Sequence, residues 1–296
     1  MNSADGEHAV GVVLEAAEMG KFKWSENKIQ QLEAEGRGKG TGVGYKPWVE
    51  VTDFSSQGKS RRIFSRKTGR VHHLLSDVEW QLFLLLEFSR NVIDIREQYP
   101  LRRDETLSLA AQRNIKHPIY PGTTVATVMT CDFLVTFERD GQKSLAAFSC
   151  KRSDGAEDAR KVELLEIERA YFDGLGIAHH LVFHSELPTN KVSNLVWCRG
   201  ATINNEGIEE YPDSFRELSE RLVAELRTPG RSGSFAEYCA NFEARTGAPV
   251  GTGLRIARAL LWEGRLLTDL HQRDLAATPV AMFRVAQQPT LRVVGA

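Results

Sequence analysis

Hydrophobic and polar positions near the middle of the chain first follow a helical pattern. Ser76 and Glu79 have the spacing of a helix capping box, in which a serine hydroxyl and a glutamate side chain satisfy free backbone amides. The residues that follow, WQLFLLLEF, are apolar on nearly every side, so we predict a buried helix over residues 77–88. Residues 91–99 then have the composition of a strand, which Pro100 ends.

Two further strands are predicted at residues 128–137 and 144–151. They are joined through Asp140-Gly141, a dipeptide typical of tight hairpin turns. A helix over about residues 156–175 and a strand at 179–184 follow. The predicted order is therefore helix, three strands, helix, strand, which is an α/β arrangement.

The remaining segments indicate loops and a second domain. Residues 36–44 alternate glycine with other residues, which indicates a backbone that is either flexible or closely approached. Residues 101–127 show no regular pattern, and we predict a long functional loop there. Beyond Glu186 the pattern becomes helical, with helices expected at 214–227, 235–245, 254–263 and 270–277. We therefore expect two domains, 1–185 and 186–296.

The hairpin centred on Asp140-Gly141 brings candidate catalytic residues together. Its register sets Asp132 opposite Ser149 and Thr130 opposite Lys151. Period-two alternation then places Asp132, Ser149 and Lys151 on one face. The other face is apolar and holds Phe133, Val135, Phe137, Phe148 and Cys150. A surface salt bridge between Asp132 and Lys151 is the simpler interpretation of this pattern.

Glu79 makes a catalytic interpretation stronger, because it lies inside the apolar run of the predicted buried helix. A carboxylate in such a place must be solvated, paired or bound to a metal, although the capping box alone could also account for it. Two carboxylates and a lysine around one cleft suit metal-assisted phosphodiester hydrolysis. Mg²⁺ prefers oxygen ligands, and a bound Mg²⁺ lowers the pKa of water, while lysine adds positive charge near the phosphate.

Charge and composition limit the function classes further. The 296 residues include 38 Lys+Arg and 39 Asp+Glu, for a formal net charge of −1, so an interaction with nucleic acid must rest on a local patch. Six basic residues without an acid fall within 59–70: Lys59, Arg61, Arg62, Arg66, Lys67 and Arg70. They are candidates for phosphate contacts, with a solvated hairpin as the alternative.

The same composition argues against other classes of protein. With 42% hydrophobic and 26% charged residues, the chain is neither disordered throughout nor collagen-like. Its four cysteines are far apart, without zinc-module or disulfide-framework spacing, and no apolar run is long enough to span a membrane. We therefore expect a reduced, cytoplasmic protein.

Several segments in order resemble the TnsA family, the endonuclease subunits of heteromeric TnsA/TnsB/TnsC bacterial transposons. They are RKTGRVHHLLSDVE (66–79), DIREQYP (94–100), IKHP (115–118) and TCDFL (130–134). EGRG (35–38), PW (47–48) and VELLEIERAY (162–171) extend the likeness over about residues 34–184. The C-terminal third is less similar.

The resemblance implies a restriction-endonuclease-like N-terminal domain, with a mixed sheet flanked by helices. It further implies a small, mainly helical, winged-helix-like C-terminal domain that contacts an ATPase partner and DNA. Such an enzyme cuts the 5′ side of transposon ends in double-stranded DNA, while a DDE transposase (TnsB-like) cuts and joins the 3′ ends. An AAA+ ATPase (TnsC-like) regulates the complex, which is bacterial and associated with the nucleoid when active.

Site residues carry over by position. Glu79 and Asp132 resemble the family's metal-binding acids and Lys151 its catalytic lysine, with two Mg²⁺ ions expected and Mn²⁺ as an alternative. Ser149 stands where the family commonly has glutamine, so the metal ligand is either its shorter hydroxyl or the Cys150 carbonyl with an extra water. Glu168 matches a family glutamate that either supports the metal ligands or lies on a solvated helix face.

Two more residues and two rival functions complete these expectations. Lys116 and His117 lie in the predicted long loop, where they are candidates for contact with DNA. A stand-alone restriction or repair nuclease could use the same core. A catalytically impaired DNA-binding adaptor of the transposition complex is the second rival, since the change from glutamine to Ser149 could have cost the metal.

Overall fold

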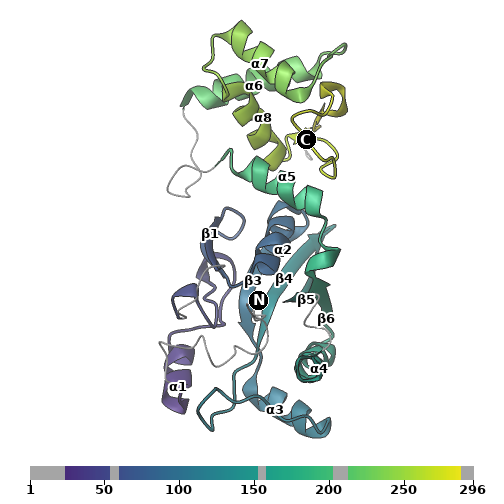
Figure 1. The fold of residues 1–296 in the computed structure, drawn as a ribbon. Coiled ribbons are helices and arrows are strands. Elements are labelled where there is room, and N and C mark those ends of the chain that lie inside the picture. Colours follow the sequence, from purple (N-terminus) through teal and green to yellow (C-terminus); the bar gives the residue numbers. More distant parts are fainter. Residues whose placement is uncertain (1–23, 54–59, 153–157, 203–212, 288–296) are drawn as a thin grey trace, which may run out of the picture. The chain divides into compact units, whose positions relative to one another are not determined.

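The computed structural model describes residues 24–53, 60–152, 158–202 and 213–287 (Figure 1). The chain divides into two compact units, Met1–Leu187 and Pro188–Ala296, close to the boundary expected near residue 185. Among the described residues, no helix combines the length and the apolar character that crossing a membrane requires.

The first unit is built on a four-stranded mixed sheet. Strands β3 (Val92–Pro100), β4 (Thr130–Arg139) and β5 (Gln142–Lys151) are antiparallel neighbours, and β6 (Ala178–Phe183) pairs with β5 in parallel. The parallel pair is joined by helix α4 (Ala159–Gly174), as a crossover connection requires. Sheet order β3-β4-β5-β6 leaves β3 and β6 at the edges.

Helices cover both faces of this sheet (Figure 1). Helix α2 (Asp77–Phe88) has the bounds that the sequence predicts, and it packs on one face around Phe83, Phe133 and Val135. On the other face, α4 packs together with α3 (Arg103–Gln112) around Leu134 and Ile167. The sheet between two helical layers confirms the predicted α/β class.

Smaller elements pack against this core. Helix α1 (Glu26–Ala34) precedes the glycine-rich segment, and the hairpin β1 (Arg61–Ser65) and β2 (Arg70–Leu74) precedes α2. Gly38 has a φ of 76°, and a Cβ there would overlap the ring of Pro100 at the end of β3. The backbone at Gly38 is therefore closely approached, one of the two alternatives left open for the glycine-rich segment.

The prediction that residues 101–127 form one long loop was wrong. They contain α3, which begins after Arg102 without a side-chain cap. Only Thr106 and Ala110 of this helix are buried, so it lacks the stripe of large apolar residues by which helices are recognised in a sequence.

The second unit is mainly helical. Its helices are α5 (Thr189–Arg199), α6 (Asp213–Arg227), α7 (Phe235–Thr246) and α8 (Thr252–Trp262). A two-stranded antiparallel sheet, β7 (Leu266–Leu267) with β8 (Arg284–Val285), follows them. The rings of Phe235 and Phe283 stack at 3.8 Å and tie α7 to the segment before β8.

The second unit differs from the sequence-based expectation at two places. Helix α5 was not predicted, and the helix expected at 270–277 is a series of turns. In these turns the carboxylate of Asp269 accepts the backbone N–H of His271, and Asp274 accepts those of Ala276 and Ala277. Side chains that bond their own backbone in this way compete with helix formation.

Candidate active site

The first turn of α2 fixes the carboxylate of Glu79. Ser76 caps the helix: its Oγ accepts the Glu79 backbone N–H at 3.2 Å and donates to Glu79 Oε1 at 2.8 Å. The backbone N–H of Leu75 donates to Oε2 at 2.9 Å. Because Glu79 is only 1% exposed, these hydrogen bonds set the orientation of its carboxylate. The carboxylate caps the helix and still contacts a residue of another element, Gln98 on β3.

The β4–β5 hairpin positions Asp132 beside β5. Its ladder runs from Phe133 opposite Phe148 to Arg139 opposite Gln142, which is the predicted register. The turn residues Asp140 and Gly141 both have positive φ, at 53° and 77°. Just beyond the ladder, Asp132 Oδ2 accepts the backbone N–H of Cys150 at 2.6 Å.

The apolar face of the hairpin also lies as predicted. Phe133, Val135 and Cys150 belong to the cluster under α2, with Phe137 and Phe148 packed against it. On the α4 side, Ala147 is buried in the second cluster.

The pKa values of Glu79 and Asp132 both respond to the charge of Lys151. Burial, followed by the charge of Asp132, raises the pKa of Glu79 to about 8, while the Lys151 ammonium opposes the rise. Burial also raises the pKa of Asp132; Lys151 opposes this and the charge of Glu168 adds to it. Two buried carboxylates that ionise with difficulty are a donor set that a divalent cation would stabilise in the ionised form.

Lys151 ends β5 with its ammonium in the same region. The residue is 5% exposed, and its Nζ has no hydrogen-bond partner among the described residues. A buried ammonium without a partner is costly, so it is poised for an anion such as a phosphate. The surface salt bridge considered from the sequence is therefore not formed: Asp132 and Lys151 are both buried, and Lys151 Nζ has no hydrogen-bond partner among the described residues.

Ser149 lies in a different set of contacts, on the α4 side of the sheet. Its Oγ donates to Glu168 Oε1 at 2.5 Å and lies 2.8 Å from His179 Nε2. Glu168 is fully buried, which excludes the solvated helix face as its environment. Potential ligand atoms of Cys131, Glu168 and His179 lie within 4.8 Å of one another, and the second oxygen of Glu168 lacks a partner among the described residues.

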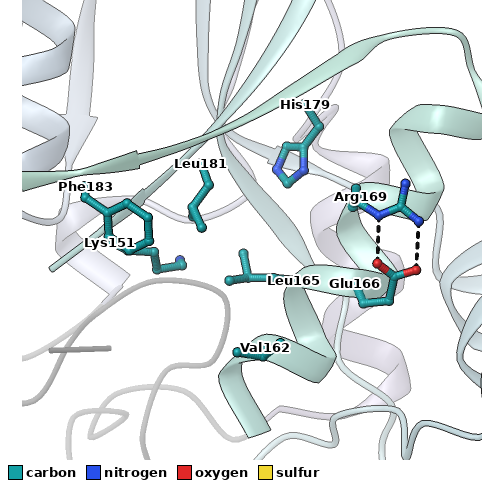
Figure 2. Close-up of a pocket in the computed structure, with 8 residues that line it drawn as sticks. All are labelled: Lys151, Val162, Leu165, Glu166, Arg169, His179, Leu181 and Phe183. Carbon is teal, nitrogen blue, oxygen red and sulfur yellow. Dashed lines mark hydrogen bonds and ion pairs between the residues drawn. The ribbon is translucent and has the colours of Figure 1, made fainter. Parts of the chain in front are cut away.

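A pocket of about 340 Å³ opens on this side of the sheet (Figure 2). Lys151 lies in its wall, with apolar side chains from α4 and β6 around it. Arg169 and Glu166 on α4 close part of the wall through two hydrogen bonds of 2.7 and 2.9 Å. The other lining residues are Val162, Leu165, His179, Leu181 and Phe183.

The structure divides the predicted basic segment into exposed and internal residues. Arg62 and Arg66 are exposed on and after β1, and Arg61 pairs with Asp77 at 2.9 Å while remaining 44% exposed. Lys67 instead donates to the carbonyls of Ser89, which caps the end of α2, and Val92, which begins β3, both at 2.6 Å. Lys59 lies outside the described residues.

Arg70 is part of a buried ion network that the sequence did not indicate. Its guanidinium forms a two-point contact with Glu97 on β3, at 2.8 and 2.5 Å, and His72 Nδ1 lies 2.7 Å from the same carboxylate. Burial alone would raise the pKa of Glu97, but His72 and Arg70 hold it well below its usual range. Arg70 therefore holds β2 against β3, and its guanidinium is not exposed to DNA.

Lys116 and His117 follow α3. Lys116 is exposed, and its carbonyl accepts a hydrogen bond from Arg160 at 2.5 Å. His117 is half-buried, with Nδ1 2.9 Å from the Pro118 carbonyl and Nε2 3.0 Å from Thr106 Oγ1. Burial lowers the pKa of His117, which disfavours the charged form of the ring. Both of its hydrogen-bond partners are uncharged groups.

Gln98 is the site residue that the sequence reasoning missed. It lies on β3 with its Nε2 3.4 Å from both Glu79 Oε2 and Asp132 Oδ1. The sequence carries only a weak signal for this residue. Gln98 follows Glu97 in the segment DIREQYP, where apolar and polar residues do not alternate regularly as they do in a half-buried strand.

The mixed sheet flanked by helices is the architecture of a restriction-endonuclease-like domain, and Glu79 on α2, Asp132 on β4 and Lys151 on β5 are all buried in it. Residues 89–184 match the model of the TnsA-like endonuclease N-terminal family. Over 203 residues the chain is 39% identical to the Transposon Tn7 transposition protein TnsA of Escherichia coli, with 69% of each chain covered. The chain belongs to the TnsA family and is an endonuclease of DNA transposition.

Proposed function

We propose that the chain hydrolyses the phosphodiester at the 5′ side of transposon ends in double-stranded DNA. It does so within an assembly in which a DDE transposase cuts and joins the 3′ ends, so that the element is excised. The observation that carries this proposal is the joint burial of Glu79, Asp132 and Lys151, with both acids raised in pKa and the ammonium unpaired among the described residues.

Glu79, Asp132 and the Cys150 carbonyl would hold the divalent cation of this family, which we propose to be Mg²⁺ in two copies, with Mn²⁺ able to replace it. A bound cation supplies a water of lowered pKa and neutralises charge on the phosphate. The Ser149 hydroxyl is already bonded to Glu168 and His179, which favours the Cys150 carbonyl as the ligand. Glu168 then acts on the site through Ser149 and through its charge on Asp132.

Lys151 would place its ammonium against the scissile phosphate. Burial removes competing water, so a single positive charge there stabilises the developing negative charge more than an exposed one would. The chain's own contribution is thus to hold one cationic side chain and two carboxylates in a water-poor region.

The exposed basic residues of the β1–β2 hairpin are proposed to contact DNA phosphates. Arg61, Arg62 and Arg66 remain exposed, whereas Lys67 and Arg70 serve the fold. Replacing both Arg61 and Arg62 with alanine should reduce the slope of log K against log salt by about 1.8, since each phosphate contact contributes about 0.9. Arg139→Ala, an exposed arginine at the hairpin turn, is the control; an unchanged slope in the double variant would refute the contact.

Residues 188–296 are proposed to bind the AAA+ ATPase partner and DNA. Family membership supports this assignment, and the exposed apolar side chains of Val250 and Met282 are available for a protein contact. Crosslinking of the full chain to its ATPase partner, read by mass spectrometry, should place the crosslinks after residue 188. Crosslinks confined to the first unit would contradict this.

Strand-specific cleavage tests the catalytic proposal. Full-length protein is mixed with Mg²⁺, DNA carrying transposon ends, and the transposase and ATPase partners. Glu79→Ala, Asp132→Ala and Lys151→Ala should abolish the 5′-side cut and leave the 3′-side cut, while Lys143→Ala, exposed on the same strand as Lys151, should cut normally. Full 5′ cutting by Asp132→Ala would refute the assignment, and cutting of DNA without partners would favour a stand-alone nuclease.

A further inference from the structure

Gln98 has an unusual backbone conformation for a residue inside a strand. Its φ is 46°, in the left-handed region, and the residue is only 4% exposed. A residue other than glycine in this conformation costs of order 1 kcal/mol or more, so surrounding contacts must hold it. One such contact is the Gln98 carbonyl, which accepts the backbone N–H of Trp48 at 3.1 Å.

The conformation of Gln98 changes which way its strand faces. Ile95 packs under α2, and Tyr99, four residues later, packs in the cluster under α4. The neighbouring strand changes face at the same level, because Phe133 belongs to the first cluster and Cys131 to the second. In regular strands, residues an even number apart face the same side. Gln98 and Asp132 lie at this change of face, and both are buried.

The amide of Gln98 is oriented by its neighbours. Thr130 Oγ1 donates to Gln98 Oε1 at 3.2 Å, so the carbonyl end of the amide is engaged by a hydroxyl. The NH₂ end is then directed at the two carboxylates, 3.4 Å from Glu79 Oε2 and 3.4 Å from Asp132 Oδ1. A hydrogen-bond donor therefore lies between two buried acids that would otherwise repel each other.

We propose that Gln98 is a positioning residue of the metal site. Its NH₂ group bridges Glu79 and Asp132 and holds the two carboxylates at one place, ready for a divalent cation. The inference rests on the proposed metal-dependent nuclease function, which it deepens. Ser149, which stands where the family commonly has an amide side chain, is bonded to Glu168 and His179, so Gln98 is the amide that contacts both acids.

Titration of the metal-free, full-length protein with Mg²⁺ by calorimetry tests this role. Because partners that orient metal ligands usually matter by 10-fold or more, Gln98→Leu should weaken Mg²⁺ binding about 10-fold. Thr130→Val, which removes only the hydroxyl that orients the amide, should give a smaller loss in the same direction. Gln112→Leu, on the exposed end of α3, is the matched control and should bind as the wild type does.

A second variant separates positioning from simple packing. Gln98→Glu keeps the shape of the side chain but puts a third carboxylate where the donor was. Its metal-free form should unfold at a lower temperature than the wild type, and saturating Mg²⁺ should raise its Tm by more. If Gln98 only fills space, the Mg²⁺-induced rise in Tm will be the same for Gln98→Glu and the wild type.

The two proposals can fail separately. Equal Mg²⁺ affinity in Gln98→Leu and the wild type, with Asp132→Asn still weakening it, would overturn the role of Gln98 alone. Equal affinity in Asp132→Asn and the wild type, or no Mg²⁺ binding to the wild type, would remove the metal site itself and with it both proposals.

Discussion

Glu79 and Asp132 are buried carboxylates whose ionisation the fold opposes. The pKa of Glu79 is raised from 4.5 to about 8, so the folded protein holds a proton there that the unfolded chain has already lost. A group of this kind stabilises the folded state at low pH, and the stability is lost as the pH rises from about 4.5 through about 8. Without a cation, the proposed active site is thus a source of instability at neutral and alkaline pH.

Glu79→Gln should remove this dependence. The variant carries no ionisable group there, so the free energy of unfolding of the wild type should fall relative to the variant by about 3–4 kcal/mol between pH 5 and pH 8. Urea unfolding of both proteins in EDTA across this range measures it. Parallel pH profiles would show that Glu79 titrates normally.

The pKa of Glu97 is shifted in the opposite direction, below its usual range. Its depressed pKa means that the Arg70–Glu97–His72 network contributes stability above the unfolded value of 4.5 and loses it as the pH falls. Glu97→Gln leaves the Arg70 charge buried and should cost about 3 kcal/mol at pH 7, a difference that narrows below pH 4.5. Chemical unfolding at pH 7 and pH 4 gives both values. Glu163→Gln, which breaks an exposed pair with Arg160, should cost under about 1 kcal/mol.

At the scale of elements, the β4–β5 turn aligns Asp132 with β5 in the proposed active site. The register set by Asp140 and Gly141 carries through to the bond between Asp132 and the Cys150 backbone. A turn of two residues therefore determines which residues face each other at the far ends of the two strands. Helix α2 acts similarly, since its cap at Ser76 fixes the orientation of Glu79.

Gly141→Val should destabilise the protein by about 1–2 kcal/mol, because a β-branched residue is strained at the observed φ of 77°. Gly44→Ala is a suitable control, since Gly44 has no positive φ and open space where a Cβ would stand. Thermal unfolding of the two variants tests the difference. Equal losses would mean that the turn does not need its left-handed conformation.

At the scale of the whole molecule, the proposed metal site lies entirely within the unit Met1–Leu187. Ligands that bind only the folded state stabilise it, by about 2.7 kcal/mol at 100 times Kd. For a unit of this size such a gain corresponds to a rise in Tm of about 5–11 °C. The second unit contains none of the proposed ligands.

Scanning calorimetry of the full chain should therefore show two transitions, of which Mg²⁺ raises only one, and EDTA should reverse the shift. In Asp132→Asn neither transition should move with Mg²⁺. Equal shifts of both transitions in the wild type would indicate cation binding that does not depend on the acids of the first unit.

The sequence by itself determined the features that depend on residues close together in the chain. The cap at Ser76 and the apolar run after it gave the bounds of α2, and Asp140-Gly141 gave the register of the hairpin. Where local signals are weak or mixed, as in α3 and in the turns around Asp274, the predictions were wrong. Propensity and pattern act over a few residues, which is why their success follows the strength of local signals.

Only the tertiary structure decided which side chains meet across long separations in sequence. It pairs Arg70 with Glu97 and bonds Ser149 to Glu168 and His179. It also sets Gln98 between Glu79 and Asp132. These contacts depend on which face of a strand each residue occupies, and β3 and β4 both change face at the level of Gln98 and Asp132. A prediction from alternating residues assumes a regular strand. The left-handed conformation of Gln98 breaks that regularity, and only the packed strands show it and the contacts that depend on it.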